Sequence, residues 1–387
     1  MLTVGIDITS ALYGRGVSRY TLNLVRALLR HKKHKYTLYG SALRGHSQLV
    51  QIAEELKKST GTKAGVVIQA YPPSLYNFLW NNMAFPKLKS TLPDIDVFHS
   101  WDWIQPPDKD LPLVSTVHDL AMLKFPEIAH PKLKYMHQRS WKILKERGAH
   151  LIAVSRATRN DIVELLEYPP EKVHVIYEAL PEEVVAIGKE LSEEVAQTTM
   201  TKLGLVKPYI LAVGTREPRK NLERLIEAWK PLKDDIDLVI AGEAGWDATS
   251  TGTKLSELPQ IRLLGKVDDT TLAVLYTNAE VFAYPSLYEG FGLPILEAFY
   301  FGTPVLTSNI SSMSEIAGNA ALFVDPLSVD EIGAGLQTLL RESESEKNVR
   351  RQKMVIRQHM FSWNQTAEQT EAVYSTAVQE YRERTTK

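Results

Sequence analysis

Short runs of β-branched and other apolar residues alternate with longer amphipathic stretches along almost the whole chain. In the first half, the runs of strand length lie at 2–8, 36–40, 64–70, 96–100, 113–119, 151–155 and 173–177. Stretches between them, such as 18–30 and 157–167, have the spacing of helices that bury one face. Strands alternating with helices at this spacing predict right-handed crossovers and a parallel sheet.

A second series of the same kind follows an acidic, polar stretch at 178–207, where the pattern weakens. Its strand-like runs lie at 209–214, 237–243, 261–265, 281–286, 304–308 and 321–325, and the last stretch, 361–384, has the pattern of a terminal helix. The sequence therefore predicts an α/β fold of two doubly wound, Rossmann-like domains that face each other across a cleft at the carboxyl ends of their sheets. We place these domains at 1–185 and 186–364, followed by a C-terminal helix at 365–387.

Composition narrows the class of protein further. At 387 residues the chain is too long for one ordinary core, and its net charge of −1 gives no basic field that would favour nucleic acid as a partner. The chain has no cysteine, which excludes disulfides, thiolate zinc sites and cysteine nucleophiles. No run approaches the roughly 18 apolar residues of a membrane span, and the start lacks the pattern of a signal peptide. We expect a soluble, cytoplasmic protein, and peripheral contact with a membrane remains open.

The loop after the first strand of each series carries residues suited to an anion. In the first loop, Gly14 and Gly16 allow a close backbone approach before a helix, although Arg19 stands where a dinucleotide fingerprint needs glycine. A turn that only needs glycine explains this loop equally well. In the second loop, Gly214 ends the strand, and Arg216, Arg219 and Lys220 precede a helix whose dipole they oppose. That conflict favours a diphosphate site over a solvated charge cluster.

Two further loops follow strands and carry ionisable residues. His118 lies in the run at 113–119, directly after its apolar part, and would face the crevice, although a structural histidine is equally plausible there. The stretch SLYEGFGLPILEA at 286–298 brackets a glycine loop with Glu289 and Glu297, and a helix starts near Gly292. A helix start tolerates one acid, and a surface position explains the other, but both together with the glycines favour a ligand site.

Two other features are interpreted as structural rather than as ligand-binding. The D-x-D triplets at 94–96 and 235–237 stand before strands, so we read them as solvated strand starts rather than as Mg²⁺ ligands. His118 has no second ligand at metal-binding spacing, so no metal site is predicted. The stretch 74–90 mixes aromatic residues with lysines, which is compatible with a membrane-touching or acceptor-binding face. An ordinary, partly buried helix or loop is the favoured interpretation.

Together these blocks resemble the family-4 retaining glycosyltransferases of the GT-B fold. The resemblance rests on EGFGLPILE, GTREPRKN and VHDL, and extends to LVIAGEAGW (238–246), LYTNAEVFAYPS (275–286), GTPVLTSNISSMSEIAG (302–318) and FSW (361–363). It covers nearly the whole chain, most densely 209–325, and looks closest to bacterial enzymes that build polysaccharide or lipopolysaccharide. One departure is VIYEALPEE (175–183), which replaces the usual Pro-Asn-Gly turn between the domains.

The resemblance implies a role for each site residue. Arg219 and Lys220 match the cations that hold the diphosphate of a nucleotide sugar, Glu289 matches the acid at the donor sugar, and Glu297 matches the acid at the ribose. His118 matches a histidine beside the donor sugar. Further donor-binding positions are Gly16, Gly214, Arg216, Phe291, Gly292 and Leu293. The first domain would be the acceptor side, and the C-terminal helix would pack back toward it.

The implied activity is metal-independent transfer of mannose or glucose, with retention, from GDP-mannose or UDP-glucose to a hydroxyl of a growing glycan or lipid-linked acceptor. No cofactor is implied. Two alternatives remain open: a non-catalytic sugar-nucleotide-binding subunit of a polysaccharide assembly complex, and a sugar-nucleotide epimerase of the same fold. A phosphorylase would need a lysine for pyridoxal phosphate, and no stretch of the sequence suggests one.

Overall fold

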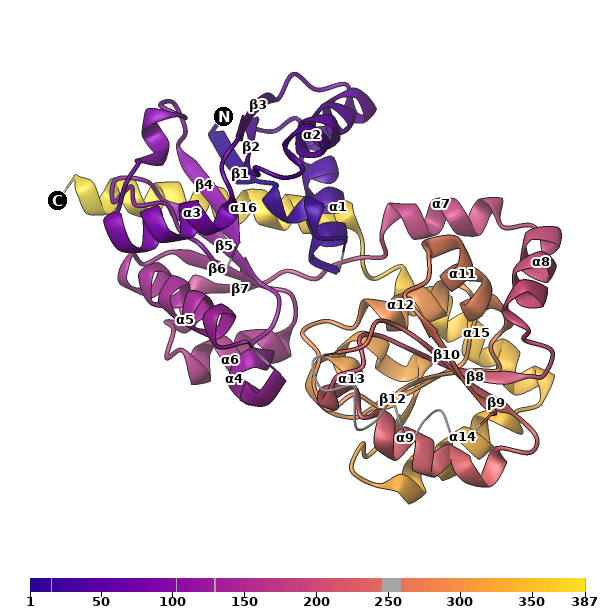
Figure 1. Cartoon of the computed structure of the whole chain (residues 1–387). Helices are drawn as coiled ribbons and strands as arrows, with labels where there is room; N and C mark the ends of the chain where they lie inside the picture. Colours follow the sequence, from indigo (N-terminus) through magenta and orange to yellow (C-terminus); the bar gives the residue numbers. More distant parts are fainter. Residues whose placement is uncertain (15, 102, 129, 246–258, 387) are drawn as a thin grey trace. The chain divides into compact units, whose positions relative to one another are not determined.

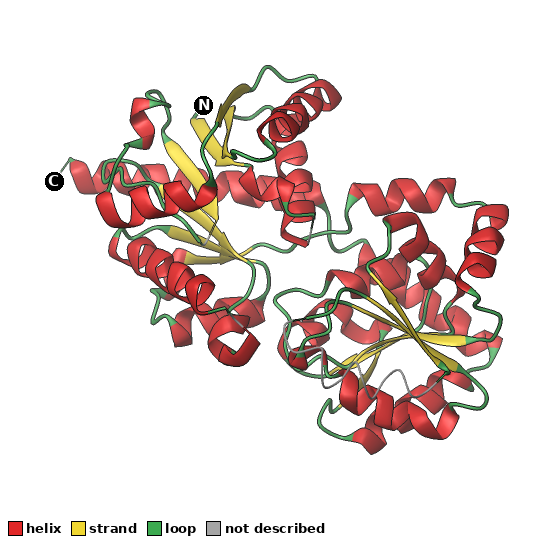
Figure 2. Cartoon of the chain, viewed as in Figure 1, coloured by secondary structure: helices red, strands yellow, loops and turns green. Residues whose placement is uncertain are grey.

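The chain forms two compact units, each built around a parallel sheet with helices on both faces (Figures 1 and 2). A computed structural model describes residues 1–14, 16–101, 103–128, 130–245 and 259–386. The first unit comprises Met1–Lys124, Ala129–Glu178 and Ser362–Lys387, and the second comprises Phe125–Ile128 and Ala179–Phe361. The prediction of two Rossmann-like α/β domains is confirmed.

The first sheet has the strand order β3-β2-β1-β4-β5-β6-β7 in the part of the chain that the structure describes, and all neighbouring strands are parallel. Its strands are β1 (Thr3–Asp7), β2 (Lys35–Ser41), β3 (Gly65–Gln69), β4 (Val97–Trp101), β5 (Leu113–Val117), β6 (His150–Ala153) and β7 (Val173–Val175). Each run predicted in the first half forms one of them. Every residue of β4 and β5 is buried, because helices cover both faces of a parallel sheet.

The helices of the first unit include one from the far end of the chain. They are α1 (Gly16–His31), α2 (His46–Thr60), α3 (Pro73–Phe78), α4 (Ala121–Lys124), α5 (Pro131–Glu146), α6 (Arg156–Leu165) and α16 (Trp363–Thr385), with single-turn helices such as η1 (Thr9–Leu12), η2 (Leu79–Met83) and η3 (Leu88–Ser90). Helix α16 packs on α1 and contacts β4, β5 and β6. The buried Glu371 of α16 accepts a hydrogen bond of 2.8 Å from the Tyr36 hydroxyl and lies 3.2 Å from His31 Nδ1.

The second sheet has the strand order β10-β9-β8-β11-β12-β13 within the described residues, again with parallel neighbours. Its strands are β8 (Tyr209–Val213), β9 (Asp237–Ala241), β10 (Ile261–Gly265), β11 (Val281–Tyr284), β12 (Val305–Ser308) and β13 (Leu322–Val324). They match the predicted runs of the second series. Trp246, which ends the block LVIAGEAGW, lies outside the described residues.

Two groups of helices cover this second sheet (Figure 1). Helices α9 (Leu222–Trp229) and α14 (Val329–Leu340) pack against each other, and α12 (Leu293–Tyr300) packs against α11 (Asp269–Asn278), α13 (Ser311–Ala317) and α15 (Glu344–Gln358). The core between α9, α14 and the sheet includes Trp229, Leu238 and Leu336. Trp229 is fully buried, and its indole N–H donates to the Ile236 carbonyl at 2.9 Å.

The stretch 178–207, for which the weak sequence pattern predicted no element, contains two helices, α7 (Glu182–Glu190) and α8 (Glu193–Leu203). Helix α7 contacts α11, and the Tyr300 hydroxyl donates to the Val185 carbonyl at 3.0 Å. The continuous part of the second unit begins at Ala179, and the boundary proposed from the sequence lies after residue 185. In the described part of the chain, no helix combines the length and the apolar character needed to cross a membrane.

Candidate functional site

Two loops at the carboxyl edge of the second sheet lie together, although they are far apart in the sequence. Arg219 and Lys220 belong to the loop after β8, and Glu289 belongs to the loop after β11. These strands are hydrogen-bonded neighbours, so their following loops meet at one edge of the sheet. A backbone hydrogen bond of 2.7 Å from Leu287 N–H to the Arg219 carbonyl joins the two loops directly.

Glu289 is held between the two cations. Lys220 Nζ donates to Glu289 Oε1 at 2.6 Å, and Arg219 Nη1 donates to Glu289 Oε2 at 2.7 Å. Lys220 also donates to the Tyr284 hydroxyl at 2.9 Å, and Arg219 Nε donates to Glu217 at 2.8 Å. The sequence brought the two cations together, and the structure adds Glu289 to the same cluster.

Burial and charge compete in this cluster. Burial alone would raise the pKa of Glu289, but the positive charges of Lys220 and Arg219 outweigh it and lower that pKa to about 2. Burial and the nearby Arg219 lower the pKa of Lys220, and the carboxylate of Glu289 opposes that shift. Glu289 is therefore an ionised, nearly buried carboxylate between two cations.

The loop after β8 depends on two residues with positive φ. Gly214 has φ 136°, and a Cβ added there would lie 3.1 Å from Lys220 Cε, so glycine at this position leaves room for the lysine side chain. Asn221 has φ 59°, and its buried amide donates to the carbonyls of Pro285 and Pro326 at 3.0 and 2.6 Å. Asn221 was not predicted to shape the site, although an asparagine between a cation pair and a helix start favours a left-handed turn.

Arg216 does not join the ion pairs around Glu289. Its backbone N–H donates to the Glu243 carbonyl at 3.0 Å, next to an isolated bridge with Ala244. Its Nε is buried and has no hydrogen-bond partner among the described residues. A buried guanidinium N–H of this kind favours an anionic ligand, because an unsatisfied buried donor is costly.

The second acid of the loop, Glu297, lies inside α12. Gly292 adopts φ 108° just before the helix, which begins at Leu293, so Glu297 falls in the second turn as predicted. Glu297 is only 4% exposed and accepts a hydrogen bond of 3.1 Å from the Tyr276 hydroxyl, which excludes the alternative of a surface position. The Phe291 ring is buried against Phe361, with ring centroids 5.8 Å apart.

The first unit carries the other predicted site residues. His118 follows β5, and its Nδ1 lies 3.3 Å from Oε1 of the buried Glu178. The Tyr20 ring of α1 meets the His118 ring edge-on, with centroids 4.7 Å apart. Gly16 begins the same helix, and a Cβ added there would meet no described atom within 4 Å. Glu178 was not predicted as a site residue, although it lies in VIYEALPEE (175–183), the stretch that replaces the usual Pro-Asn-Gly turn.

The two D-x-D triplets, 94–96 and 235–237, lie at the amino ends of β4 and β9. Among the described residues, no group of three or more histidines and carboxylates is placed to hold an ion. Asp96 accepts a hydrogen bond of 2.8 Å from the Thr3 N–H. The interpretation of Asp237 as a solvated strand start is wrong, because it is buried at the start of β9, 4.0 Å from Arg262 Nε.

Comparisons with known proteins agree with this architecture. A family model described as glycosyl transferases group 1 matches residues 198–354, and one described as glycosyltransferase family 4 matches residues 14–184. A solved glycosyltransferase from Rickettsia africae has a TM-score of 0.69 at 15% identity and covers 97% of this chain and 98% of its own. Anabaena HepE, solved with UDP and glucose, has a TM-score of 0.68 at 15% identity, with 97% and 100% covered. The fold is that of the GT-B glycosyltransferases.

A curated relative extends the match at the level of sequence. The O-antigen chain mannosyltransferase B of Escherichia coli is 29% identical over 376 residues, which is 93% of this chain and 95% of the relative. The two family models match separate parts of the chain and together span most of it. Both parts of the chain are thus similar to glycosyltransferases, the first to those of family 4 and the second to those of group 1.

Proposed function

We propose that the protein transfers a hexosyl group, mannose or glucose, from a nucleoside-diphosphate sugar to a hydroxyl of a growing glycan or lipid-linked acceptor, with retention of configuration. The observation that carries this proposal is the Arg219–Glu289–Lys220 cluster at the carboxyl edge of the second sheet. The name of the Escherichia coli relative supports a mannosyl donor, and the UDP and glucose bound to HepE support a glucosyl donor.

The cluster suits the charge changes of this reaction. Cleavage of the bond to the diphosphate builds positive charge on the sugar ring and negative charge on the leaving group. Arg219 and Lys220 would stabilise the leaving diphosphate without a metal, since fixed charges in a buried site need little reorganisation. Arg216 would add its buried N–H to the same anion. The N–H groups of Phe291, Gly292 and Leu293, at the start of α12, would contact sugar and phosphate.

The two acids would divide the rest of the donor between them. Glu289 would accept hydrogen bonds from the sugar hydroxyls, and Glu297 would bind the ribose hydroxyls from the second turn of α12. When the donor binds, its diphosphate would neutralise part of the positive charge of Arg219 and Lys220 that Glu289 neutralises in the free protein. Glu289 would then have an oxygen available for the sugar.

The chemical step proposed is attack on the same face of the sugar from which the diphosphate leaves. A phosphate oxygen would accept the proton of the attacking hydroxyl, because no carboxylate is assigned as a covalent nucleophile. His118 would orient the donor sugar, and Glu178 would hold the imidazole through Nδ1. A lipid-linked acceptor would bring the enzyme to the inner face of a membrane, and this contact and a cytoplasmic location are part of the proposal.

The Lys220→Ala variant tests the assignment of the diphosphate site. Release of nucleoside diphosphate from GDP-mannose and UDP-glucose is measured at saturating donor, with and without a panel of glycan acceptors. We expect turnover to fall by about two orders of magnitude, as for loss of one stabilising donor in other active sites. Lys230→Ala, which removes an exposed lysine from the same unit, is the matched control. Turnover of Lys220→Ala near that of the control would refute the assignment.

Two outcomes would replace the proposal by one of its alternatives. Conversion of a nucleotide sugar to its epimer without any acceptor would identify an epimerase. Tight binding of a nucleotide sugar with no turnover on any acceptor would favour the non-catalytic subunit. For a transferase, the anomeric proton signals of donor and product report directly on retention.

A further inference from the structure

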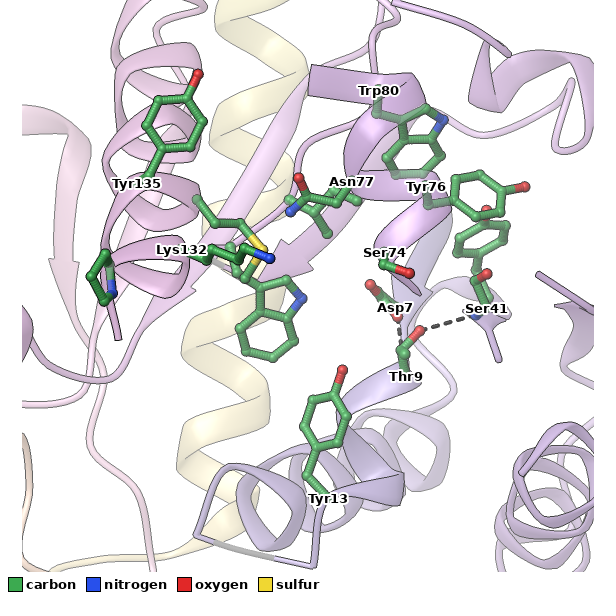
Figure 3. A pocket seen from close by; sticks show the side chains of 15 residues that line it. Asp7, Thr9, Tyr13, Ser41, Ser74, Tyr76, Asn77, Trp80, Lys132 and Tyr135 are labelled. Atoms are coloured by element: carbon green, nitrogen blue, oxygen red, sulfur yellow. Dashed lines mark hydrogen bonds between the residues drawn. The ribbon is translucent and has the colours of Figure 1, made fainter. Parts of the chain in front are cut away.

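A pocket of about 1010 Å³ opens at the amino edge of the first sheet, and we call it the amino-edge pocket. Its walls come mainly from the loop between β4 and β5, the turn between α5 and β6, the residue before β7 and the last turns of α16. The smaller pocket at the carboxyl edge, which contains Asp7 and Tyr13 (Figure 3), lies on the side that the family resemblance assigns to the acceptor. The described lining of the amino-edge pocket contains none of the predicted site residues, so the proposed function gives this pocket no role.

Positive charges converge on the amino-edge pocket from separate segments. The β4–β5 loop, the turn after α5, the start of β7 and helix α16 carry, in this order, Lys109, Arg147, Lys172 and Arg384. A Cβ added at Gly148 would lie 3.7 Å from Arg384 Nη1, which places this guanidinium over the turn that carries Arg147. Burial lowers the pKa of both Arg147 and Lys172, and the positive charge of Arg384 lowers both further. These side chains are therefore close enough to repel one another.

Two of these cations have partners that the fold itself requires. Arg147 donates to the carbonyls of Pro106 and Leu111 at 2.6 and 2.7 Å, and these bonds hold the β4–β5 loop in place. Lys172 forms an ion pair with Glu380 of α16. Both side chains would be needed at these positions even if the pocket bound nothing.

The other two cations have no such role. Lys109 and Arg384 form no ion pair within the described part of the chain, and Arg384 lies over the Tyr381 ring, 5.6 Å from its centroid. The negative end of α16 favours a cation such as Arg384 in its last turn. That effect does not explain Lys109, which lies in a loop.

The charge of the lining as a whole is positive. Among the described lining residues, five cationic side chains face three carboxylates, those of Glu146, Glu380 and Glu383. His150 adds no charge at pH 7, because burial lowers its pKa to about 4. An excess of positive charge in a concave site favours an anion, which would also relieve the repulsion around Arg384.

The size of the pocket and its other walls favour an organic anion. The volume is at the upper end of the range of small-molecule sites, roughly 300–1,000 Å³, and inorganic phosphate would fill only a small part of it. Leu113, Ile143 and the Tyr381 ring offer contacts for a carbon skeleton, and the carboxylates of Glu146 and Glu383 can accept hydrogen bonds from hydroxyls. An acyl chain, by contrast, would leave the cations without a counter-ion.

We propose that the amino-edge pocket binds a small phosphate monoester that carries hydroxyl groups, with its phosphate between Arg384 and Lys172. The ligand fastens the end of α16 to the rest of the first unit. The ion pair of Arg382 with Asp96, at 3.3 Å, is a weak tie by itself, because exposed ion pairs contribute little to stability. The pocket opens at the edge of the sheet opposite to His118, so its ligand is an effector rather than a substrate. This inference goes beyond the proposed function and does not depend on it.

Arg384→Ala is the most informative variant, because this side chain is exposed and the fold does not depend on it. Arg382→Ala removes the same charge from the same helix outside the lining and is the matched control. Binding to the full-length protein is followed by calorimetry and phosphorus NMR with glucose 6-phosphate, mannose 6-phosphate and glycerol 3-phosphate. Inorganic phosphate, glucose and vesicles of phosphatidylglycerol are the comparison probes. Lys220→Ala tests whether the same esters bind at the diphosphate site instead.

At least one ester is expected to bind equally to the wild type, Arg382→Ala and Lys220→Ala, and about tenfold more weakly to Arg384→Ala, because one charge-assisted contact is lost. The bound ester should also slow backbone hydrogen exchange at 380–386 in the wild type but not in Arg384→Ala. The inference is overturned if no ester binds, if Arg384→Ala binds like its control, or if Lys220→Ala abolishes binding. Equal affinity for inorganic phosphate would overturn the organic ligand, and binding of vesicles in place of the esters would overturn the soluble one.

Discussion

Replacing Glu289 by glutamine should destabilise the second unit and at the same time strengthen its binding of nucleoside diphosphates. The amide keeps the shape of the side chain but leaves Arg219 and Lys220 without the charge that now lies 2.7 and 2.6 Å from them. A pKa held at about 2 rather than 4.5 corresponds to about 3 kcal/mol of interaction in favour of the ionised form. Removing one partner of a buried pair usually costs a similar amount, roughly 3–5 kcal/mol.

That free energy predicts a shift of thermal unfolding. In a unit of this size, 1 kcal/mol changes the melting temperature by about 2–4 °C, so E289Q should melt about 6–12 °C below the wild type. Differential scanning fluorimetry without ligand measures the change. Glu223→Gln makes the same chemical substitution at an exposed position next to the cluster and should leave the melting temperature unchanged.

The binding effect has the opposite sign. In E289Q no carboxylate at this position competes with a diphosphate for Arg219 and Lys220. UDP or GDP should therefore bind about tenfold more tightly, and the same 3 kcal/mol sets an upper limit near a hundredfold. Saturating nucleotide should therefore raise the melting temperature of E289Q more than that of the wild type. Equal melting temperatures and equal nucleotide affinities in E289Q and E223Q would refute the reasoning.

Further predictions concern pH and two other buried carboxylates. Because folding lowers the pKa of Glu289, its stabilising effect is complete above about pH 4.5 and is lost as the pH falls toward 2; thermal unfolding across this range should therefore show a steeper loss of stability in the wild type than in E289Q. Glu297→Gln should weaken UDP or GDP binding about tenfold but change the affinity for the 2′-deoxynucleotide little, as titration calorimetry can measure; equal losses for both ligands would contradict a ribose contact. Glu371→Gln should reduce the free energy of unfolding of the first unit by roughly 1–3 kcal/mol in urea, whereas the exposed control Glu368→Gln should not.

The strands of both sheets were predictable because their signal is local. Strands such as β5 (Leu113–Val117) and β11 (Val281–Tyr284) are short and buried on both faces, and turn residues or helical patterns separate the runs that predicted them. The helices α7 and α8 were missed for the converse reason. Helix α8 buries none of its residues, so no apolar face marks it in the sequence.

For the candidate site, the sequence predicted where its residues lie in the fold but not which side chains contact each other. Loops after parallel strands were expected at one edge of each sheet, which located His118, Lys220 and Glu289. That Glu289 would bind Lys220 depends on β8 and β11 being neighbours, although 69 positions separate the two residues. His118 and Glu178 are 60 positions apart, and the strand-like runs alone do not fix such a contact.

Helix α16 has a consequence for how the chain folds during synthesis. Except for Phe125–Ile128, the second unit is one continuous stretch, Ala179–Phe361, and all of it leaves the ribosome before α16 does. The first unit must wait for that helix, because Glu371 and Tyr374 supply buried partners for Tyr36 and His99. The unit that is translated first is thus completed last. Until then, the surface of α1 and of the central strands that α16 covers stays open to water and to chaperones.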